Sequence, residues 1–277
     1  MDMLSLFLIS IPVGFIGSLT GLGGASILIP LMVFSGIPVK EAIASAMVSV
    51  VATSSGSASA YVRERLANVR IAMYLEMFTC VGAIIGATIT TWIAPIYLYF
   101  FFAAFLMTSF LKPGGGRRQE GRAGRPSKAE RLSKWLELEG SYFDEATKET
   151  VDYRADRPIL GGAGMMVAGI AAGMLGIGAG AFKVTVQENV LKLPPKVAST
   201  TSNFIIGMTA LAGTSVYLFS GLLNITLMAP MAMGTTLGSV AGGRVLNRLS
   251  HTTLRVLFSV VVSLLIVQML YKGIASW

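Results

Sequence analysis

The sequence is poor in the residues that bind metals and form disulfides. Its 277 residues include one cysteine, Cys80, and one histidine, His251. A single cysteine excludes an internal disulfide, and so small a supply of ligands argues against haem, iron–sulfur and structural zinc sites. A membrane redox enzyme is therefore disfavoured. We expect no catalytic residue, no metal and no cofactor.

Charged residues are scarce as well, at 13% of the chain, whereas a typical soluble protein has about 25%. Hydrophobic residues make up 53% and the mean hydropathy is +0.69. Several apolar runs exceed the ~18 residues that cross a bilayer. These features predict a polytopic membrane protein surrounded by lipid. The net charge of +8 needs no nucleic-acid partner, because membrane proteins concentrate Lys and Arg on the cytoplasmic side.

Two glycine-rich turns interrupt long apolar stretches. Thr20–Ala25 reads TGLGGA, and Leu175–Gly180 reads LGIGAG. Irregular backbone at membrane depth is tolerated only where it is buried in protein or lines a wet cavity. Nucleotide-binding loops are excluded, because a Rossmann turn follows a strand in a soluble unit and a P-loop needs Gly-Lys-Ser/Thr. Both turns are therefore predicted to lie inside the membrane protein.

The two halves of the chain repeat each other. Identical residues are paired at an offset of 156 from Pro38 onward and at an offset of 155 before it. The pairs include Pro38 with Pro194, Lys40 with Lys196, Thr53 with Thr209, Tyr61 with Tyr217, Asn68 with Asn224, Gly82 with Gly238, Gly86 with Gly242, Gly14 with Gly169, Gly21 with Gly176 and Gly23 with Gly178. We interpret this register as an internal duplication.

Each half is predicted to contain a glycine-broken segment followed by three membrane spans. The spans are Val39–Tyr61, Val69–Ala94 and Pro95–Leu111, then Pro195–Phe219, Ile225–Leu246 and Thr253–Ile274. Two glycines four residues apart recur on the middle span of each half, Gly82 and Gly86 in the first, Gly238 and Gly242 in the second. That spacing lets helix backbones approach closely, so tight packing is their expected role.

Residues 112–157 separate a first membrane repeat, 1–111, from a second, 158–277. This stretch carries eleven of the 22 basic and nine of the 14 acidic residues. It opens with the flexible Pro113–Gly116, contains a capping box from Ser127 to Glu130, and is predicted to form a small hairpin over Tyr142–Arg154. We expect a cytoplasmic insertion with a structural or regulatory role.

The charge distribution selects between two topologies. If each glycine-broken segment crosses the membrane, the halves run parallel; if each is re-entrant, the halves are inverted. Only the re-entrant arrangement places five further basic residues on the cytoplasmic side, as the positive-inside rule requires: Lys192, Lys196, Arg244, Arg248 and Arg255. The predicted fold is thus an all-α polytopic membrane protein with two inverted repeats. Each repeat comprises a glycine-broken re-entrant helical hairpin and three transmembrane helices, a plan common in secondary transporters.

The order of the motifs resembles the sulfite exporter TauE/SafE family, the toluene-sulfonate uptake permease group. The matching motifs are Gly21–Gly24 followed by Pro30, Gly176–Gly180 followed by Lys183, and Lys196–Phe204 followed by Asn224. Gly140–Glu145 is similar to a subgroup with the same insertion. The resemblance covers both halves and implies transport of sulfite, organosulfonates or related sulfur-containing anions.

The two turns are the candidate substrate-binding site. A helix that starts at a hairpin tip presents free N–H groups and the positive end of its dipole, and glycine lets an anion approach that backbone. The alternative is a turn that serves only close packing. The candidate residues are Gly21, Gly23, Gly24, Ala25, Gly176, Gly178, Ala179 and Gly180.

Polar side chains near the second turn complete the candidate site. An ionisable residue such as Lys183 costs several kcal/mol at membrane depth unless it is paired, so a substrate contact is the first hypothesis. Snorkelling or a pair with Glu188 is the alternative. Thr201, Ser202 and Asn203 would donate to oxyanion oxygens, or would bond only the preceding helical turn or a neighbouring helix.

Glu76 admits two interpretations, a proton relay or an ion pair at the membrane surface. It follows Arg70 by six residues, and this short separation favours a pair with Arg70 or Arg65.

Together these features predict a secondary transporter of the cell (inner) membrane that moves a small sulfur-containing anion by alternating access. An anion channel and a non-transporting scaffold of a sulfur-metabolism complex are the alternatives. The exact substrate, the direction of transport, the coupling ion (H+ or Na+) and assembly as a homodimer stay open.

Overall fold

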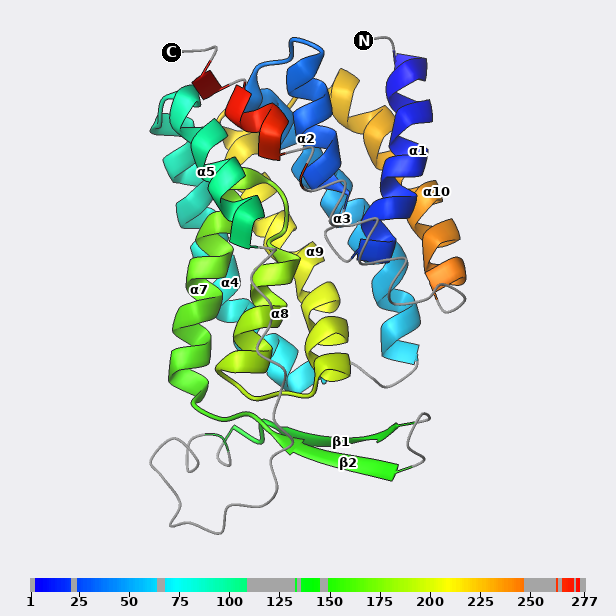
Figure 1. Ribbon diagram of the computed structural model, residues 1–277, viewed down its shortest axis with the longest axis vertical. Coiled ribbons are helices and arrows are strands. Elements are labelled where there is room, and N and C mark those ends of the chain that lie inside the picture. The colour runs from blue at the N-terminus through cyan, green and yellow to red at the C-terminus, as the bar shows by residue number, and fades with distance from the viewer. Residues whose placement is uncertain are drawn as a thin grey trace.

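The computed structural model describes residues 3–20, 24–63, 68–108, 133, 136–144, 149–246, 263, 266–271 and 273–274. The helices form an elongated bundle, and two strands lie at one end of it (Figure 1). The helices are α1 (Met3–Thr20), α2 (Ala25–Phe34), α3 (Val39–Arg63), α4 (Val69–Trp92), α5 (Pro95–Thr108), α7 (Pro158–Leu175), α8 (Gly180–Asn189), α9 (Pro195–Phe219) and α10 (Ile225–Leu246). The strands are β1 (Glu139–Asp144) and β2 (Glu149–Arg154).

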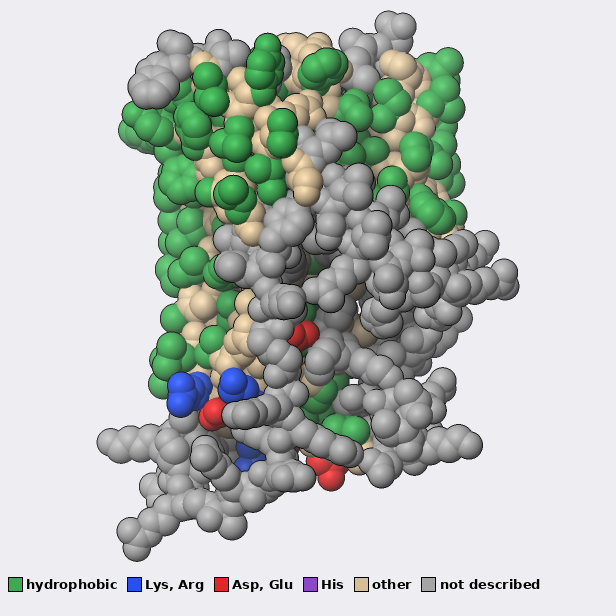
Figure 2. Space-filling view, in the orientation of Figure 1, with side chains coloured by type: hydrophobic (Ala, Val, Ile, Leu, Met, Phe, Trp, Pro, Cys, Tyr) green, Lys and Arg blue, Asp and Glu red, His purple; other side chains and the backbone are tan. Residues whose placement is uncertain are grey.

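The bundle has the surface of a membrane protein. Within the described chain, four stretches are long and apolar enough to cross a bilayer: Val69–Trp92, Pro158–Leu175, Thr200–Phe219 and Ile225–Gly242. Large apolar side chains cover the described surface of the helices, whereas the charged side chains in view gather near the strands (Figure 2). So continuous an apolar surface is rare on soluble monomers. The predicted polytopic, largely helical membrane protein is confirmed.

The predicted spans agree closely with the helices that the structure describes. The bounds of α9 and α10 are those predicted, and α4 ends at Trp92, two residues before the expected Ala94. Asparagine accounts for the start of two of these helices. Asn68 Oδ1 accepts from Ile71 N at 3.1 Å, and its repeat mate Asn224 accepts from Thr226 N at 3.1 Å. The last predicted span, Thr253–Ile274, lies largely outside the described residues.

The strands confirm the small hairpin expected in residues 112–157. β1 and β2 pair antiparallel from Glu139 opposite Arg154 to Asp144 opposite Glu149, so the hairpin begins three residues before the expected start. The fold is therefore not wholly α-helical. The predicted capping box at Ser127 and Glu130 lies outside the described part of the chain.

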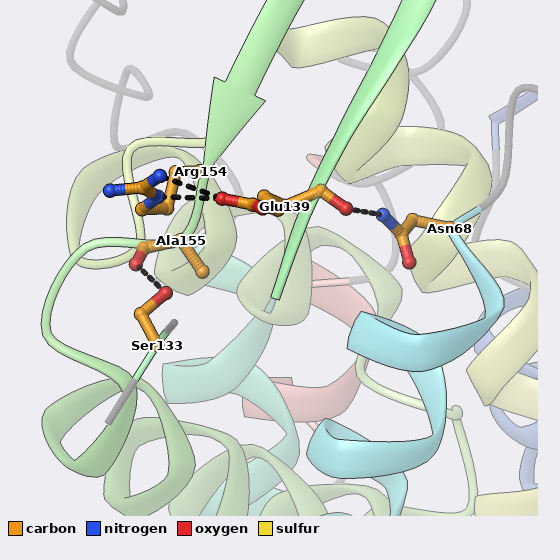
Figure 3. Close-up of polar contacts among 5 residues, drawn as sticks. All are labelled: Asn68, Ser133, Glu139, Arg154 and Ala155. Atoms are coloured by element: carbon orange, nitrogen blue, oxygen red, sulfur yellow. Dashed lines mark hydrogen bonds and ion pairs between the residues drawn. The ribbon is translucent and has the colours of Figure 1, made fainter. Parts of the chain in front are cut away.

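This β-hairpin is fastened to the end of the bundle (Figure 3). Asn68 Nδ2 donates to the carbonyl of Glu139 at 3.1 Å, while the carboxylate of Glu139 accepts from Arg154 at 2.7 and 2.9 Å. Ser133 Oγ donates to the carbonyl of Ala155 at 2.7 Å. Leu138 is also buried in one apolar cluster with Ile71, Ala72 and Leu75 of α4. The hairpin is thus packed on the membrane helices by both polar and apolar contacts.

The two broken segments follow similar paths from opposite ends. In Figure 1, α1 runs from the end that carries the N-terminus toward the middle of the bundle, and α2 returns toward that end. From the β-hairpin, α7 runs toward the middle and α8 returns toward the strands. The second glycine turn is buried in the interior of the bundle, as its apolar flanks predicted, whereas residues 21–23 of the first turn lie outside the described residues.

Glycines join these segments to the middle span of the other half. A Cβ at Gly82 of α4 would overlap the carbonyl of Met166 in α7, and one at Gly238 of α10 would overlap the carbonyl of Ile11 in α1. The two contacts are related by the repeat offsets, because Gly82 pairs with Gly238 and Ile11 with Met166. The expected close packing at these glycines is present, and α1 lies along α10 as α7 lies along α4.

Candidate functional site

The second glycine turn is built from left-handed backbone. Gly176 ends α7 with φ +68° and donates its N–H to the carbonyl of Ala172 at 2.8 Å. Gly178 has φ +70° and Ala179 has φ +51°, after which Gly180 starts α8. A glycine adopts this region without steric cost, whereas an alanine is strained there. The sequence of this turn therefore reverses the chain within a few residues.

The turn is wedged between α3 and α9. A Cβ at Gly178 would lie 2.9 Å from Ile206 Cγ2 and 3.3 Å from Val50 Cγ1, and one at Gly176 would lie 2.8 Å from the carbonyl of Ile43. Val50 and Ile206 are themselves a repeat pair, so the turn sits where equivalent parts of the two halves meet. Close packing is therefore one role of these glycines. Anion binding by the same backbone stays a prediction.

The first turn is described only where α2 begins. Gly24 has φ +73°, and its carbonyl accepts from the N–H groups of Ile27 and Leu28 at 3.0 and 3.1 Å. Ala25, the first residue of α2, is completely buried. Gly21 and Gly23 lie outside the described residues, so the expected meeting of the two turns is still untested.

Lys183 lies on α8, one turn past the glycine turn, and is completely buried. Its Nζ donates to Thr209 Oγ1 of α9 at 2.7 Å. That hydroxyl in turn lies 3.2 and 3.3 Å from the two carboxylate oxygens of Glu76 on α4. The partner of this lysine is thus the Thr209–Glu76 pair, in place of the suggested Glu188. A cation and a carboxylate are joined through one hydroxyl inside the bundle.

Glu76 was misplaced by the sequence argument. The structure pairs Arg70 with Glu137, just before β1, while Glu76 is turned into the bundle with 8% of its surface exposed. Its Oε2 accepts from Thr79 Oγ1 at 3.1 Å, and its Oε1 accepts from Cys80 Sγ at 2.9 Å. The expected ion pair with Arg70 is therefore wrong, and Arg65, the other partner suggested, lies outside the described residues.

A helical signal for this burial was present in the sequence. Glu76, Thr79, Gly82 and Gly86 follow one another at steps of three or four, so they share one face of α4. That is the face predicted to pack closely against another helix. A glutamate on this face of α4 points toward the neighbouring helix, so its carboxylate does not reach the basic residues at the membrane surface.

The predicted polar residues of α9 divide between two neighbours. Ser202 is buried, and its Oγ donates to the carbonyl of Gly180 at 3.2 Å, which ties α9 to the start of α8. Asn203 lies about 100° further round the helix and is half-buried. Its carbonyl accepts from Ser54 Oγ of α3 at 3.1 Å. The contacts thus bring Ser202 to the second turn and Asn203 to α3.

Five buried polar side chains lack a hydrogen-bond partner among the described residues: Ser45, Ser49, Gln187, Thr201 and Thr214. Two of them adjoin the candidate site along the chain, namely Thr201 next to Ser202, through its hydroxyl, and Gln187 one turn after Lys183, through both atoms of its amide. Both side chains are completely buried. Buried polar groups are normally hydrogen-bonded, and an unpaired one costs about 1–3 kcal/mol. Such groups are suited to contact a polar ligand.

Comparison with known proteins identifies the chain at the level of its family. The family described as sulfite exporter TauE/SafE matches residues 6–269. The chain belongs to the sulfite exporter TauE/SafE family. It is 24% identical over its whole length, and over the whole of the relative, to the "Probable membrane transporter protein YunE" of Bacillus subtilis (strain 168). It is also 24% identical to "Probable membrane transporter protein YdhB" of that organism, over 91% of this chain and 92% of the relative. No solved structure matches the chain.

In this member of the TauE/SafE family, the buried polar residues Lys183, Gln187 and Glu76 have apolar residues at the positions that the repeat makes equivalent to them. The repeat offsets pair Lys183 with Leu28 and Gln187 with Met32, and all four side chains are completely buried. The mate of Glu76 is Ala232. The first half thus packs apolar side chains where the second half places a cation and an amide. The two halves therefore differ in polarity at these positions, although the side chains of the first two pairs are buried in both.

Proposed function

We propose that this TauE/SafE protein is a secondary transporter that moves a small sulfur-containing anion, such as sulfite or an organosulfonate, across the cytoplasmic membrane by alternating access. The observation that carries the proposal is the complete burial of Lys183 one turn into α8, in a chain whose relatives are named membrane transporters. A buried cation in a membrane helix usually marks the path of an ion or a substrate.

The start of α8 supplies the other half of an anion site. The backbone N–H of Lys183 donates to the carbonyl of Ala179, in the glycine turn, at 3.0 Å. The N–H groups of Gly180, Ala181 and Phe182 precede it in the first helical turn, where amides lack intrahelical partners and the dipole is positive. A tetrahedral sulfonate would accept from these amides and from the side chains around them. The proposed substrate contacts are Gly176, Gly178, Ala179, Gly180, Lys183, Thr201, Ser202 and Asn203, joined from the first turn by Gly21, Gly23, Gly24 and Ala25.

The architecture that goes with this proposal is a pair of inverted repeats. The α1–α2 and α7–α8 segments would be re-entrant hairpins whose tips meet near the middle of the membrane, with residues 112–157 on the cytoplasmic side. Support comes from the reciprocal glycine contacts of α1 with α10 and of α7 with α4, together with the opposite directions of the two segments (Figure 1). The anion site would lie where the two halves meet. Rocking of one half against the other would then expose the anion to one side of the membrane at a time.

Anion exchange across a liposome membrane tests the proposal. Purified protein would be reconstituted in liposomes loaded with unlabelled sulfite, thiosulfate, sulfoacetate, taurine or 4-toluenesulfonate. The uptake of a labelled trace of the same compound would then be followed. A transporter shows saturable counterflow for at least one compound, compared with protein-free liposomes. A channel shows flux without counterflow, and a scaffold moves nothing, so either result contradicts the proposal.

A further inference from the structure

We propose that Glu76 is the proton-binding site that couples anion transport to H+, and that Thr209 links its protonation to anion binding at Lys183. The inference rests on the transport function proposed above and adds the coupling ion and its site. The three residues come from three helices and both halves of the chain: Glu76 from α4, Lys183 from α8 and Thr209 from α9.

The charge balance of the buried site carries the argument. Without an anion, the ammonium of Lys183 is balanced by the carboxylate of Glu76 through Thr209. A monovalent anion that binds Lys183 would leave one surplus negative charge inside the bundle. Uncompensated charge in such surroundings is very costly, and a carboxylate commonly takes up a proton to avoid it. Proton uptake at Glu76 restores neutrality, because the site then holds a neutral acid, an ammonium and the anion.

The hydrogen bonds around Glu76 accommodate both protonation states. The Thr209 hydroxyl has a single proton, and two acceptors lie within reach of it, the Glu76 carboxylate at 3.2 Å and the carbonyl of Ile205 at 3.0 Å. When Glu76 is ionised, Thr209 donates to it while accepting from Lys183. When Glu76 is protonated, its O–H donates to Thr209, whose own proton turns to Ile205. Thr79 has the same freedom, since its hydroxyl lies 3.1 Å from both Glu76 Oε2 and the carbonyl of residue 76.

The other ionisable groups around Glu76 are few. Cys80, on the same helix, donates to its Oε1, and Lys183 is the ionisable side chain that reaches it from α8. α9 presents the uncharged Thr209, and α7 contains no ionisable side chain. Glu188, also on α8, is buried but lies outside this hydrogen-bonded set. Among the described residues, Glu76 is therefore the carboxylate linked to Lys183 that can receive the proton demanded by the charge balance.

Linkage between anion and proton makes the proposal measurable. The probe is 4-toluenesulfonate, because it is monovalent, as the charge balance requires, and keeps that charge between about pH 5.5 and about pH 8, so that a pH effect reports on the protein. Binding that takes up a proton strengthens as the pH falls, by at most about tenfold per pH unit for one proton. By reciprocity, the anion favours protonation of Glu76 to the same degree.

The decisive variant is Glu76→Gln, which holds a neutral side chain at every pH. We expect it to bind the probe with the parent's low-pH affinity throughout, and therefore without a pH slope. In liposomes it should keep anion counterflow but lose uptake driven by a pH gradient. The parent should carry protons with the anion, as read from a trapped pH-sensitive dye.

Two further variants control for folding and for location. Glu76→Asp keeps a titratable carboxyl and should retain the pH slope. Glu188→Gln removes a buried carboxylate outside the Thr209 network and should behave as the parent. A folded Glu76→Gln protein with an unchanged slope, or with no counterflow, overturns the proposal. So does loss of the slope in Glu188→Gln with its retention in Glu76→Gln.

The failures of the two proposals are distinguishable. If the parent exchanges anions but binds them independently of pH and moves no protons, only the coupling at Glu76 is refuted. If no probe is exchanged by the parent protein, the transport function itself fails, and the coupling inference falls with it.

Discussion

Lys183 occupies in the second half of the chain the position that Leu28 occupies in the first, and both side chains are completely buried. Immediately after a duplication, the two halves have the same residue at each pair of equivalent positions. A lysine at one position and a leucine at its equivalent therefore show that the two halves have diverged there. Burial makes this difference expensive in a membrane helix. The anion site proposed here is accordingly asymmetric, with one cation on the side of the second turn.

The first prediction concerns the charge of Lys183. Lys183→Met keeps most of the stem and removes the ammonium. Because charge-assisted hydrogen bonds are worth roughly 1.5–3 kcal/mol, we expect substrate affinity to fall about 10- to 150-fold. Lys183→Arg should recover only part of the loss, since a planar guanidinium differs in shape from a compact ammonium. Leu28→Met is the matched control at the equivalent position and should bind as the parent does. Unchanged affinity in a folded Lys183→Met protein would make the lysine structural.

The second prediction concerns stability, and it tests the link between Lys183 and Glu76 through the hydroxyl of Thr209. Removing one member of a buried ion pair typically costs about 3–5 kcal/mol, because the other charge is left uncompensated. We expect Lys183→Met to lower the thermal unfolding temperature in detergent, and Lys183→Met with Glu76→Gln to recover most of the loss. A double-mutant cycle measures the coupling. Additive effects of the two changes would show that the two groups do not interact.

Features that depend on a local sequence pattern were predicted, whereas features that depend on contacts between distant parts of the chain were not. The bounds of α9 and α10, the presence of the β-hairpin and the close packing at the glycines of α4 rest on local patterns, and these were predicted, whereas the helix that those glycines contact, α7, was not. The partners of Glu76 were not predicted, because Lys183 and Thr209 lie more than 100 residues further along the chain, although the spacing of Glu76, Thr79 and Gly82 already indicated the packed face of α4. The wedging of Gly178 between Val50 and Ile206 is likewise a property of helix crossing, which no local pattern contains.

The third prediction concerns the paired glycines. Gly82→Ala in α4 and Gly238→Ala in α10 each place a methyl group against a carbonyl of the neighbouring helix, that of Met166 and that of Ile11 respectively. We expect each change to destabilise the protein by about 1–3 kcal/mol, as overpacking does. Ala241→Val, which adds bulk at an exposed position of α10, is the control and should have little effect. Thermal unfolding in detergent measures all three. Equal stability of parent and Gly82→Ala would contradict the close approach of α4 and α7.

The fourth prediction concerns the segment that contains the β-hairpin. Replacing Gly114–Asp152 with a short Gly/Ser linker should preserve anion counterflow, because none of the proposed substrate contacts lies within it. The same replacement removes Leu138, which is buried against Ile71 and Leu75, so the thermal unfolding temperature should fall. Leu138→Ala alone should reproduce part of that fall, since truncating a buried leucine costs about 2–5 kcal/mol. Folded, membrane-inserted protein without counterflow would assign the segment a regulatory or scaffolding role.

The last prediction decides the topology. Inverted halves place the α9–α10 connection outside the cell and the α8–α9 connection in the cytoplasm. Single cysteines at two exposed positions, Ser220→Cys and Lys192→Cys, report on these connections in a Cys80→Ser background. Serine retains a hydrogen-bond donor toward Glu76, so this background should stay folded. With an impermeant maleimide we expect labelling of Ser220→Cys in intact cells, and labelling of Lys192→Cys only after the membrane is opened. Labelling of Lys192→Cys but not Ser220→Cys in intact cells would mean that α7 and α8 together cross the membrane. The two halves would then run parallel, and the positive-inside argument from Lys192, Lys196 and Arg244 would fail.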